Sequence, residues 1–125
     1  MKILPTQTDK ASLSALGKEA CAMLMWRDYA GLADQFGYAL AHGRELAAAI
    51  EADFIAAAAS PFNEVLEENP SIVLTYFKPN STGLFAAVDC TVAIGDAACV
   101  FLSLVITGKG EEKYVTLEDV CGVAS

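Results

Sequence analysis

A few polar side chains stand inside apolar stretches, and burial would change their chemistry most. Asp89 lies between Val88 and Cys90 in the apolar stretch that runs from Leu84 to Ile106. Burial raises the pKa of a carboxyl group and makes it a candidate proton carrier. The alternative is an ordinary strand residue that is partly solvated or hydrogen-bonded, and the residues themselves leave both interpretations open.

Three further residues have the types that proton transfer needs. His42 is the only histidine, and an imidazole titrates near neutral pH. Asp53 borders the apolar stripe of a predicted helix, and Tyr38 carries a hydroxyl group. An acid and a tyrosine that face one pocket can polarise a carbonyl group and move a proton. No spacing shows that these side chains converge, so we identify no catalytic motif and leave open whether the chain is an enzyme.

The cysteines and the single histidine predict neither a metal site nor a bound cofactor. No Cys-x-x-Cys pair occurs, and one histidine does not complete a zinc site of the usual spacing. Gly108-Lys109-Gly110 is interpreted as a hairpin turn rather than a phosphate-binding loop. We expect free thiols in a reducing compartment, each packing as a small apolar residue. The four are Cys21, Cys90, Cys99 and Cys121.

The charge balance argues against two classes of partner. The net charge is −8, from 16 acidic and 8 basic residues, which is unfavourable for binding nucleic acids or an anionic membrane surface. No apolar run is long enough to span a membrane, and the first residues lack the apolar core of a secretory signal, so we expect a cytoplasmic protein. The acidity is typical of a soluble surface or of a protein with a basic partner. Four acidic residues are candidate contacts with such a partner: Glu67, Glu68, Glu111 and Glu112.

The elements that must position these residues divide the chain into a helical half and a stranded half. Apolar residues at helical spacing predict three helices followed by a shorter one, with Thr8 as the first cap. Residues 36–41 could continue the second helix or form a short strand. The helices are predicted at about residues 9–25, 28–35, 44–59 and 61–68, and strands at about 71–78, 83–94, 97–107 and 112–120. We therefore predict one α+β domain over residues 1–125, with N-terminal helices packed on a C-terminal four-stranded antiparallel curved meander.

The turn at Gly95-Asp96 decides which side chains share a face of the sheet. A two-residue turn pairs Val92 with Cys99, and side chains then alternate between the faces. We expect the helix-covered face to carry Val88, Cys90, Val92, Ile94, Cys99, Phe101, Ser103, Val105, Val115 and Leu117. We expect the other face, called the outer face below, to carry Phe85, Ala87, Asp89, Thr91, Ala93, Val100, Leu102, Leu104, Ile106, Tyr114 and Thr116. A slip of one residue would exchange the faces.

The expected outer face is too apolar for open solvent. A contiguous apolar patch usually marks an interaction surface, so Leu102, Leu104 and Tyr114 are candidate contacts with a partner or with a second copy. The alternative is that loops and the N-terminal segment of the chain itself cover this face.

The element order resembles that of a known superfamily. Besides the element order, three segments suggest the resemblance: Asp28-Tyr29-x-x-Leu32, Glu45-Leu46-x-x-x-Ile50 and the last strand, Thr116–Val120. The chain resembles the nuclear-transport-factor-like, or cystatin-like cone, superfamily. This resemblance implies a curved sheet that wraps the third helix. It also implies a range of functions rather than one, because the superfamily includes isomerases, dehydratases, small-molecule binders, dimerisation modules and immunity proteins of bacterial toxins.

Three hypotheses follow. The first is a small acidic protein-binding module, such as an immunity protein that neutralises a basic bacterial toxin. The second is a small-molecule binder or proton-transfer protein with a pocket between the third helix and the sheet. The third is a homodimeric scaffold that uses the outer face. We favour the first because the chain is small and acidic and has no catalytic motif.

Overall fold

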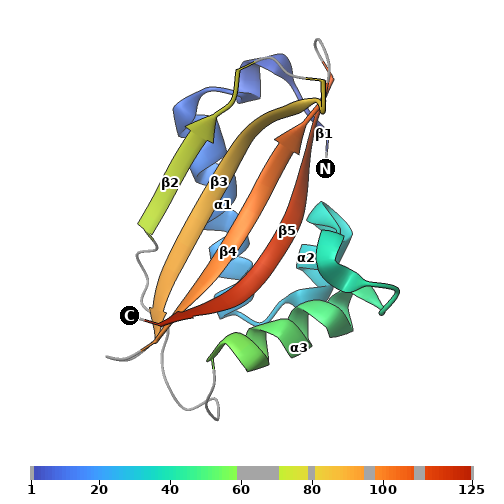
Figure 1. Cartoon of the computed structure of the whole chain (residues 1–125), viewed down its shortest axis with the longest axis vertical. Coiled ribbons are helices and arrows are strands. Elements are labelled where there is room, and N and C mark those ends of the chain that lie inside the picture. Colours follow the sequence, from blue (N-terminus) through green and yellow to red (C-terminus); the bar gives the residue numbers. More distant parts are fainter. Residues whose placement is uncertain (1, 59–70, 79–80, 95–97, 109–111, 125) are drawn as a thin grey trace.

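The strands form one antiparallel sheet in the order β1-β5-β4-β3-β2 (Figure 1). A computed structural model describes residues 2–58, 71–78, 81–94, 98–108 and 112–124. The strands are β1 (Lys2–Ile3), β2 (Ser71–Tyr76), β3 (Leu84–Ile94), β4 (Ala98–Thr107) and β5 (Lys113–Ala124). The predicted α+β class and the meander are confirmed, and the short β1 extends the sheet beyond the four predicted strands.

The helical half follows the apolar periodicity of the sequence. Its helices are α1 (Lys10–Met25), α2 (Tyr29–Phe36) and α3 (Leu46–Ala58). The cap of α1 is Asp9 rather than the predicted Thr8, because the Asp9 carboxylate accepts a hydrogen bond from the Ser12 amide at 3.3 Å. In the same way Asp28 caps α2, accepting from the Gly31 amide at 3.0 Å. Carboxylates at the helix starts therefore decide these boundaries.

The ambiguous residues 36–41 form neither a longer helix nor a strand. The helix α2 ends at Phe36, and Gly37 has a φ of +71°, a conformation that glycine adopts without steric cost. Tyr38 is then extended, and Ala39–Ala41 make a single tight helical turn. The glycine thus redirects the chain between α2 and α3.

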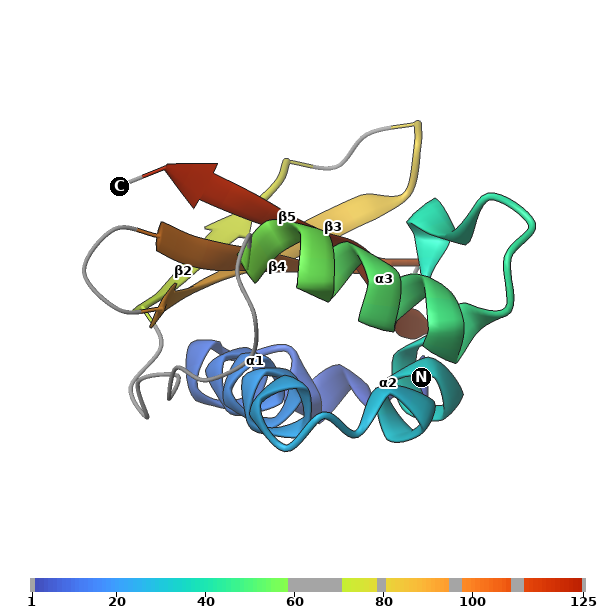
Figure 2. The same ribbon diagram turned by 90° about the horizontal axis from the view of Figure 1, so that it is seen from below.

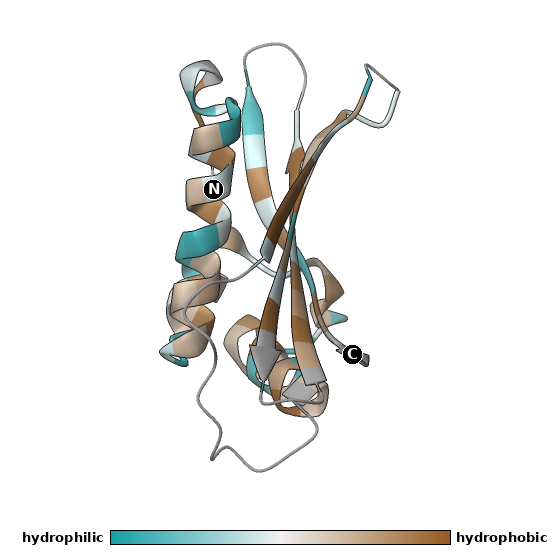
Figure 3. Ribbon diagram, turned by 90° about the vertical axis from the view of Figure 1, so that its left-hand side faces the viewer, coloured by the Kyte–Doolittle hydropathy of each residue, from teal (hydrophilic) through white to brown (hydrophobic). Residues whose placement is uncertain are grey.

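All three helices cover the same face of the twisted sheet (Figures 2 and 3). The helix α1 packs on β2 and β3, whereas α3 packs mainly on β5. Close approach needs small residues at the contact: a Cβ at Gly122 would lie 2.8 Å from the Ala57 carbonyl oxygen of α3. On α3, Ile50 and Phe54 are buried in the core, while Leu46 is exposed. None of the helices that the structure describes lies on the outer face.

The register between β3 and β4 differs by one residue from the predicted one. Val92 pairs with Val100, not with Cys99, because residues 95–97 separate the paired Ile94 and Ala98. The extra residue moves every side chain of β4 to the opposite face. The observed register is favourable because it buries four aliphatic side chains against the helices: Val100, Leu102, Leu104 and Ile106, each 0% exposed.

The corrected register changes which β4 residues can contact a partner. Leu102 and Leu104 were predicted on the outer face and are instead in the core, so neither can form a surface patch. Ser103 was predicted on the helix-covered face and lies on the outer one, opposite Asp89. The assignments of Val88, Cys90, Val92, Val115 and Leu117 to the helix-covered side are confirmed. Phe85 was predicted on the outer face, but the register shifts between Leu84 and Ala86, and its ring lies against the core beneath Lys113.

The strand β5 contains a bulge at Glu118. Ser103 pairs with Asp119, and the next residue of β4, Leu104, pairs with Leu117, so Glu118 is one residue too many. A bulge places two consecutive residues opposite one. Leu117 and Val120 are buried while Glu118 is exposed and Asp119 partly exposed, so both carboxylates lie on the outer side.

Several predicted features lie outside the described residues: the short helix at 61–68 with Glu67 and Glu68, the Gly95-Asp96 turn, and Glu111.

Candidate functional site

Carboxylates occupy two different parts of the molecule, and the first site holds Asp53 alone, with its hydrogen-bond donors. The side chain of Asp53 projects from α3 toward the segment between α2 and α3. Its Oδ2 accepts a hydrogen bond from the Tyr38 hydroxyl at 2.5 Å. Arg44 donates to both carboxylate oxygens, from Nη1 to Oδ1 and from Nη2 to Oδ2, each at 3.1 Å. The structure thus brings together Asp53 and Tyr38, two of the residues considered for proton transfer.

Arg44 also holds the tight turn that precedes it. Its Nε donates to the Ala41 carbonyl at 2.8 Å, and its Nη2 donates to the Leu40 carbonyl at 2.9 Å. Sequence reasoning missed Arg44, because nothing in the spacing of Arg44 and Asp53 links a residue before a helix to one nine positions later. The guanidinium therefore ties the turn to α3.

The electrostatics of this group favour a fixed ion pair. The Arg44 guanidinium lowers the pKa of the Asp53 carboxyl, and the hydrogen bond from Tyr38 acts in the same direction, while burial opposes both. Burial, together with the bond to Asp53, raises the pKa of the Tyr38 phenol. Asp53 is therefore a carboxylate with both oxygens occupied, and Tyr38 is a neutral donor. Neither group is poised to exchange a proton near neutral pH.

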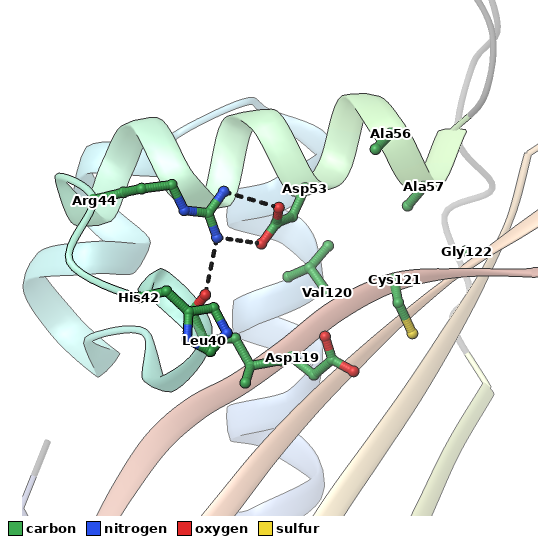
Figure 4. A pocket seen from close by; sticks show the side chains of 10 residues that line it. All are labelled: Leu40, His42, Arg44, Asp53, Ala56, Ala57, Asp119, Val120, Cys121 and Gly122. Carbon is green, nitrogen blue, oxygen red and sulfur yellow. Dashed lines mark hydrogen bonds and ion pairs between the residues drawn. The ribbon is translucent and has the colours of Figure 1, made fainter.

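A pocket of about 400 Å³ lies beside this group, between α3 and residues 119–122 of β5 (Figure 4). Its lining residues are Leu40, His42, Arg44, Asp53, Ala56, Ala57, Asp119, Val120, Cys121 and Gly122. Val120 projects toward α3, whereas Asp119 and Cys121 project from the other side of β5. His42 is exposed at this rim in a left-handed conformation, with a φ of 53°. The pocket is thus a shallow hollow whose rim reaches the outer face.

The carboxylates of the second site lie on the outer face. Asp89 of β3, Ser103 of β4 and Asp119 of β5 are neighbours in one row across the sheet. The Ser103 hydroxyl donates to Asp89 Oδ1 at 2.9 Å. We call Asp89, Glu118 and Asp119 the outer-face acids. Asp89 lies away from the core, as its predicted position implied, and its neighbour Ser103 is only 8% exposed.

The described strand lysines lie apart from the outer-face acids: Lys2 of β1 pairs with Tyr114 at the β1 end of the outer face, and Lys113 of β5 points to the other side. Lys113 is the one lysine or arginine within the strand residues 71–76, 84–94, 98–107 and 113–124. Its side chain is buried on the helix-covered side, over the ring of Phe85 at 5.0 Å. Within the part of the chain that the structure describes, ion pairs join Lys2 to Glu112 at the β1 end of the sheet and Arg44 to Asp53, and neither includes an outer-face acid.

Apolar and aromatic side chains surround the outer-face acids. Val73 is 57% exposed beside Asp89, and Tyr114 is 41% exposed nearer to β1. Phe101 and Val105 are partly exposed on the rows to either side of Ser103. Of the predicted binding residues, Tyr114 therefore lies on this face, while Glu112 pairs with Lys2 at 3.9 Å at the end of the sheet.

The cysteines divide into two pairs by position. Cys21 of α1 and Cys90 of β3 are buried, as predicted, and interact with each other, whereas Cys99 and Cys121 are only partly buried; all four are free thiols. Cys121 is only partly exposed beside Asp119, and burial together with that carboxylate raises the pKa of its thiol. A thiol with a raised pKa is a poor nucleophile, so Cys121 is not an activated cysteine.

Neither a metal centre nor a membrane span is found in the described part of the chain. Histidine, cysteine and acidic side chains nowhere gather there in a group of three or more that could hold a metal ion. No helix among these residues is long and apolar enough to cross a membrane.

Comparisons with known proteins identify no relative. No protein-family model, curated protein or solved structure matches the chain. The resemblance to the cone superfamily therefore stays a prediction.

Proposed function

We propose that this chain is a protein-binding module that receives a basic partner on the outer face of its sheet. The observation that carries the proposal is the group of outer-face acids on a sheet face whose one described strand lysine, Lys2, lies at the β1 end and pairs with Glu112. Carboxylates that no basic group of their own protein neutralises attract a cationic surface and raise its association rate.

The apolar side chains on the same face supply the apolar contact area that an interface needs in addition to charge. Protein interfaces combine an apolar and aromatic centre with polar groups that set orientation. Phe101 and Val105 stand next to Ser103 in the middle of the sheet, and Val73 extends this surface onto β2. An open sheet face of this composition suits a folded protein better than a small ligand, which is normally enclosed by a cavity.

The partner that fits this chemistry is a basic protein domain, and a basic toxin domain is one such partner. In that case the chain would act as an immunity protein, covering a cationic active surface with its acids. The net charge of −8 supports this version of the proposal. A toxin partner should stop growth when produced alone and be tolerated when produced with this chain.

The proton-transfer alternative has less support. It would use Asp53 and Tyr38, but Arg44 occupies both oxygens of Asp53. Self-association through the outer face is also disfavoured, because two copies facing each other would bring acids against acids.

The decisive experiment compares the proteins that three immobilised forms of the chain capture from extracts of its own cells. The forms are the wild type, Asp89→Lys/Asp119→Lys, and the control Asp34→Lys/Glu51→Lys, which makes the same charge change at exposed helix positions. We expect the wild type and the control to capture one basic protein that the outer-face variant loses. With that protein purified, the association rate constant should decrease as the salt concentration rises. The charge-reversal variant should lower this rate constant by about tenfold or more. Capture that is equal for all three forms, or a captured partner that is acidic, would overturn the proposal.

A further inference from the structure

The strand β2 ends the sheet on the side opposite β1, and its outward edge is unpaired among the described residues (Figure 1). The Phe77 amide donates to the Phe85 carbonyl at 2.9 Å, so this residue directs its backbone groups toward β3. Backbone groups alternate in direction along an antiparallel strand. Ile72, Leu74 and Tyr76 therefore direct their amide and carbonyl groups away from β3, toward a neighbour that could pair with them.

This edge lacks the features that usually prevent strands from pairing. Natural edge strands carry charges, prolines or bulges, or are covered by other elements. Residues 71–77, Ser-Ile-Val-Leu-Thr-Tyr-Phe, contain no charge, proline or glycine, and the β2–β3 register is regular throughout. The opposite edge differs, because β1, the turn Ala39–Ala41 and α3 all contact β5. The β5 edge of the sheet is thus covered by the chain itself, whereas the β2 edge has no feature that would prevent pairing with another strand.

From these observations we propose that β2 pairs with β2 of a second copy of this chain. A two-fold axis at Leu74 places the outward groups of Ile72 against those of Tyr76 of the partner subunit, which is the pairing that antiparallel hydrogen bonds require. The same axis sets Val73 opposite Thr75 of the partner subunit on the outer face. The strand is therefore self-complementary in its backbone groups and in its side chains.

Charge permits a second copy as the occupant of this edge. Two molecules with a net charge of −8 repel one another wherever acids would meet, but residues 71–77 bring no charge into the contact. Three large apolar residues are exposed within five positions of this strand: Val73 at 57%, Tyr76 at 46% and Phe77 at 39%. Pairing would remove part of this apolar surface from water.

The pairing has a geometric consequence for the outer face. A two-fold axis perpendicular to the sheet keeps the outer faces of both subunits on the same side. The dimer would present two rows of outer-face acids on one continuous sheet surface. Dimerisation through β2 and partner binding through the outer face are therefore compatible.

Molar mass in solution tests this inference, measured by light scattering over a range of protein concentrations. We expect a dimer for the wild type and a monomer for Val73→Lys/Thr75→Lys, because each new lysine would oppose another across the axis. Both positions are exposed, so the variant should keep the wild-type circular dichroism spectrum. The control Ala30→Lys/Ala48→Lys adds the same charge at exposed helix positions and should remain a dimer. Asp89→Asn/Asp119→Asn should also remain dimeric, which separates this inference from the proposed partner site.

Hydrogen exchange keeps the inference testable if the lysine variant does not fold. The outward amides of Ile72, Leu74 and Tyr76 should exchange slowly in concentrated wild-type protein and faster on dilution, while the Val73 and Thr75 amides change less. A monomeric wild type at all concentrations would overturn the inference. So would a dimer that the lysine variant leaves intact, or an edge occupied only by a strand of another protein.

Discussion

Asp53 and Asp89 are both aspartates beside the core, yet the protein treats them in opposite ways. Asp53 is enclosed by its own chain, with Arg44 on both oxygens and the Tyr38 hydroxyl as a third donor. Asp89 has one neutral donor, Ser103, and lies in a row with Asp119. The first carboxylate is neutralised internally and holds a turn in place. The second leaves its charge available to another molecule, and this difference separates a structural acid from a recognition acid.

The largest effect in this comparison is expected for Asp53→Ala. The variant leaves the buried Tyr38 hydroxyl without an acceptor, which should lower the free energy of unfolding by about 2 kcal/mol. Urea denaturation measures this value. Asp53→Asn keeps an oxygen acceptor and should lose less. Equal losses for the two variants would mean that the missing acceptor is not the cause.

A change of intermediate size is expected when the contribution of Asp53 to the free energy of unfolding is measured as a function of pH. Because Arg44 lowers the pKa of Asp53 in the folded state, this carboxylate stabilises the fold at pH values above its unfolded pKa of about 4. Below that pH the contribution is lost progressively, as Asp53 becomes protonated in the folded state too. The difference in unfolding free energy between wild type and Asp53→Asn should therefore shrink as the pH falls from about 5 to about 2.

The control for the pH measurement is Asp34→Asn, which removes one carboxylate from an exposed position of α2. If the difference for Asp53→Asn stayed constant across the acid range, the ion pair with Arg44 would not contribute to stability.

The smallest effect on stability is expected for the outer-face acids. Asp89→Asn keeps an acceptor for Ser103, and Asp119→Asn removes a charge from a partly exposed position. Each should change the free energy of unfolding by less than about 0.5 kcal/mol. The same substitutions should weaken binding of a basic partner. Thermal unfolding of both variants checks the first statement, and a loss as large as that of Asp53→Ala would erase the distinction between the two acids.

The three helices and the four long strands could be predicted from the sequence because each has a strong local signal, whereas the two-residue β1 and the turn Ala39–Ala41 have none. Helical spacing of apolar residues located the helices, and turn residues separated the strands. The faces of β4 could not be predicted in the same way. Its residues Val100 to Val105 are apolar on both faces except for Ser103, so their pattern does not choose a register. One more residue before Ala98 then reversed the assignment of Leu102 and Leu104.

The site was predictable in its residue types but not in its contacts. Tyr38, Asp53 and Asp89 were all candidates, and the structure pairs the first two with each other. Their meeting depends on the positive φ of Gly37 and on the reach of Arg44, and neither leaves a periodic signal. The row from Asp89 to Asp119 depends on the register of three strands, which local sequence patterns do not determine.

The bulge at Glu118 has a consequence for how the length of this chain could vary. In a regular strand, deleting one residue reverses the sides on which all later residues lie. Glu118 is already the additional residue, so its deletion would leave Leu117 and Val120 in the core and Asp119 on the outer side. Related chains could gain or lose a negative charge here by insertion or deletion, with no compensating change in the core. The strand thus offers evolution a place to adjust the acidity of the surface independently of the fold.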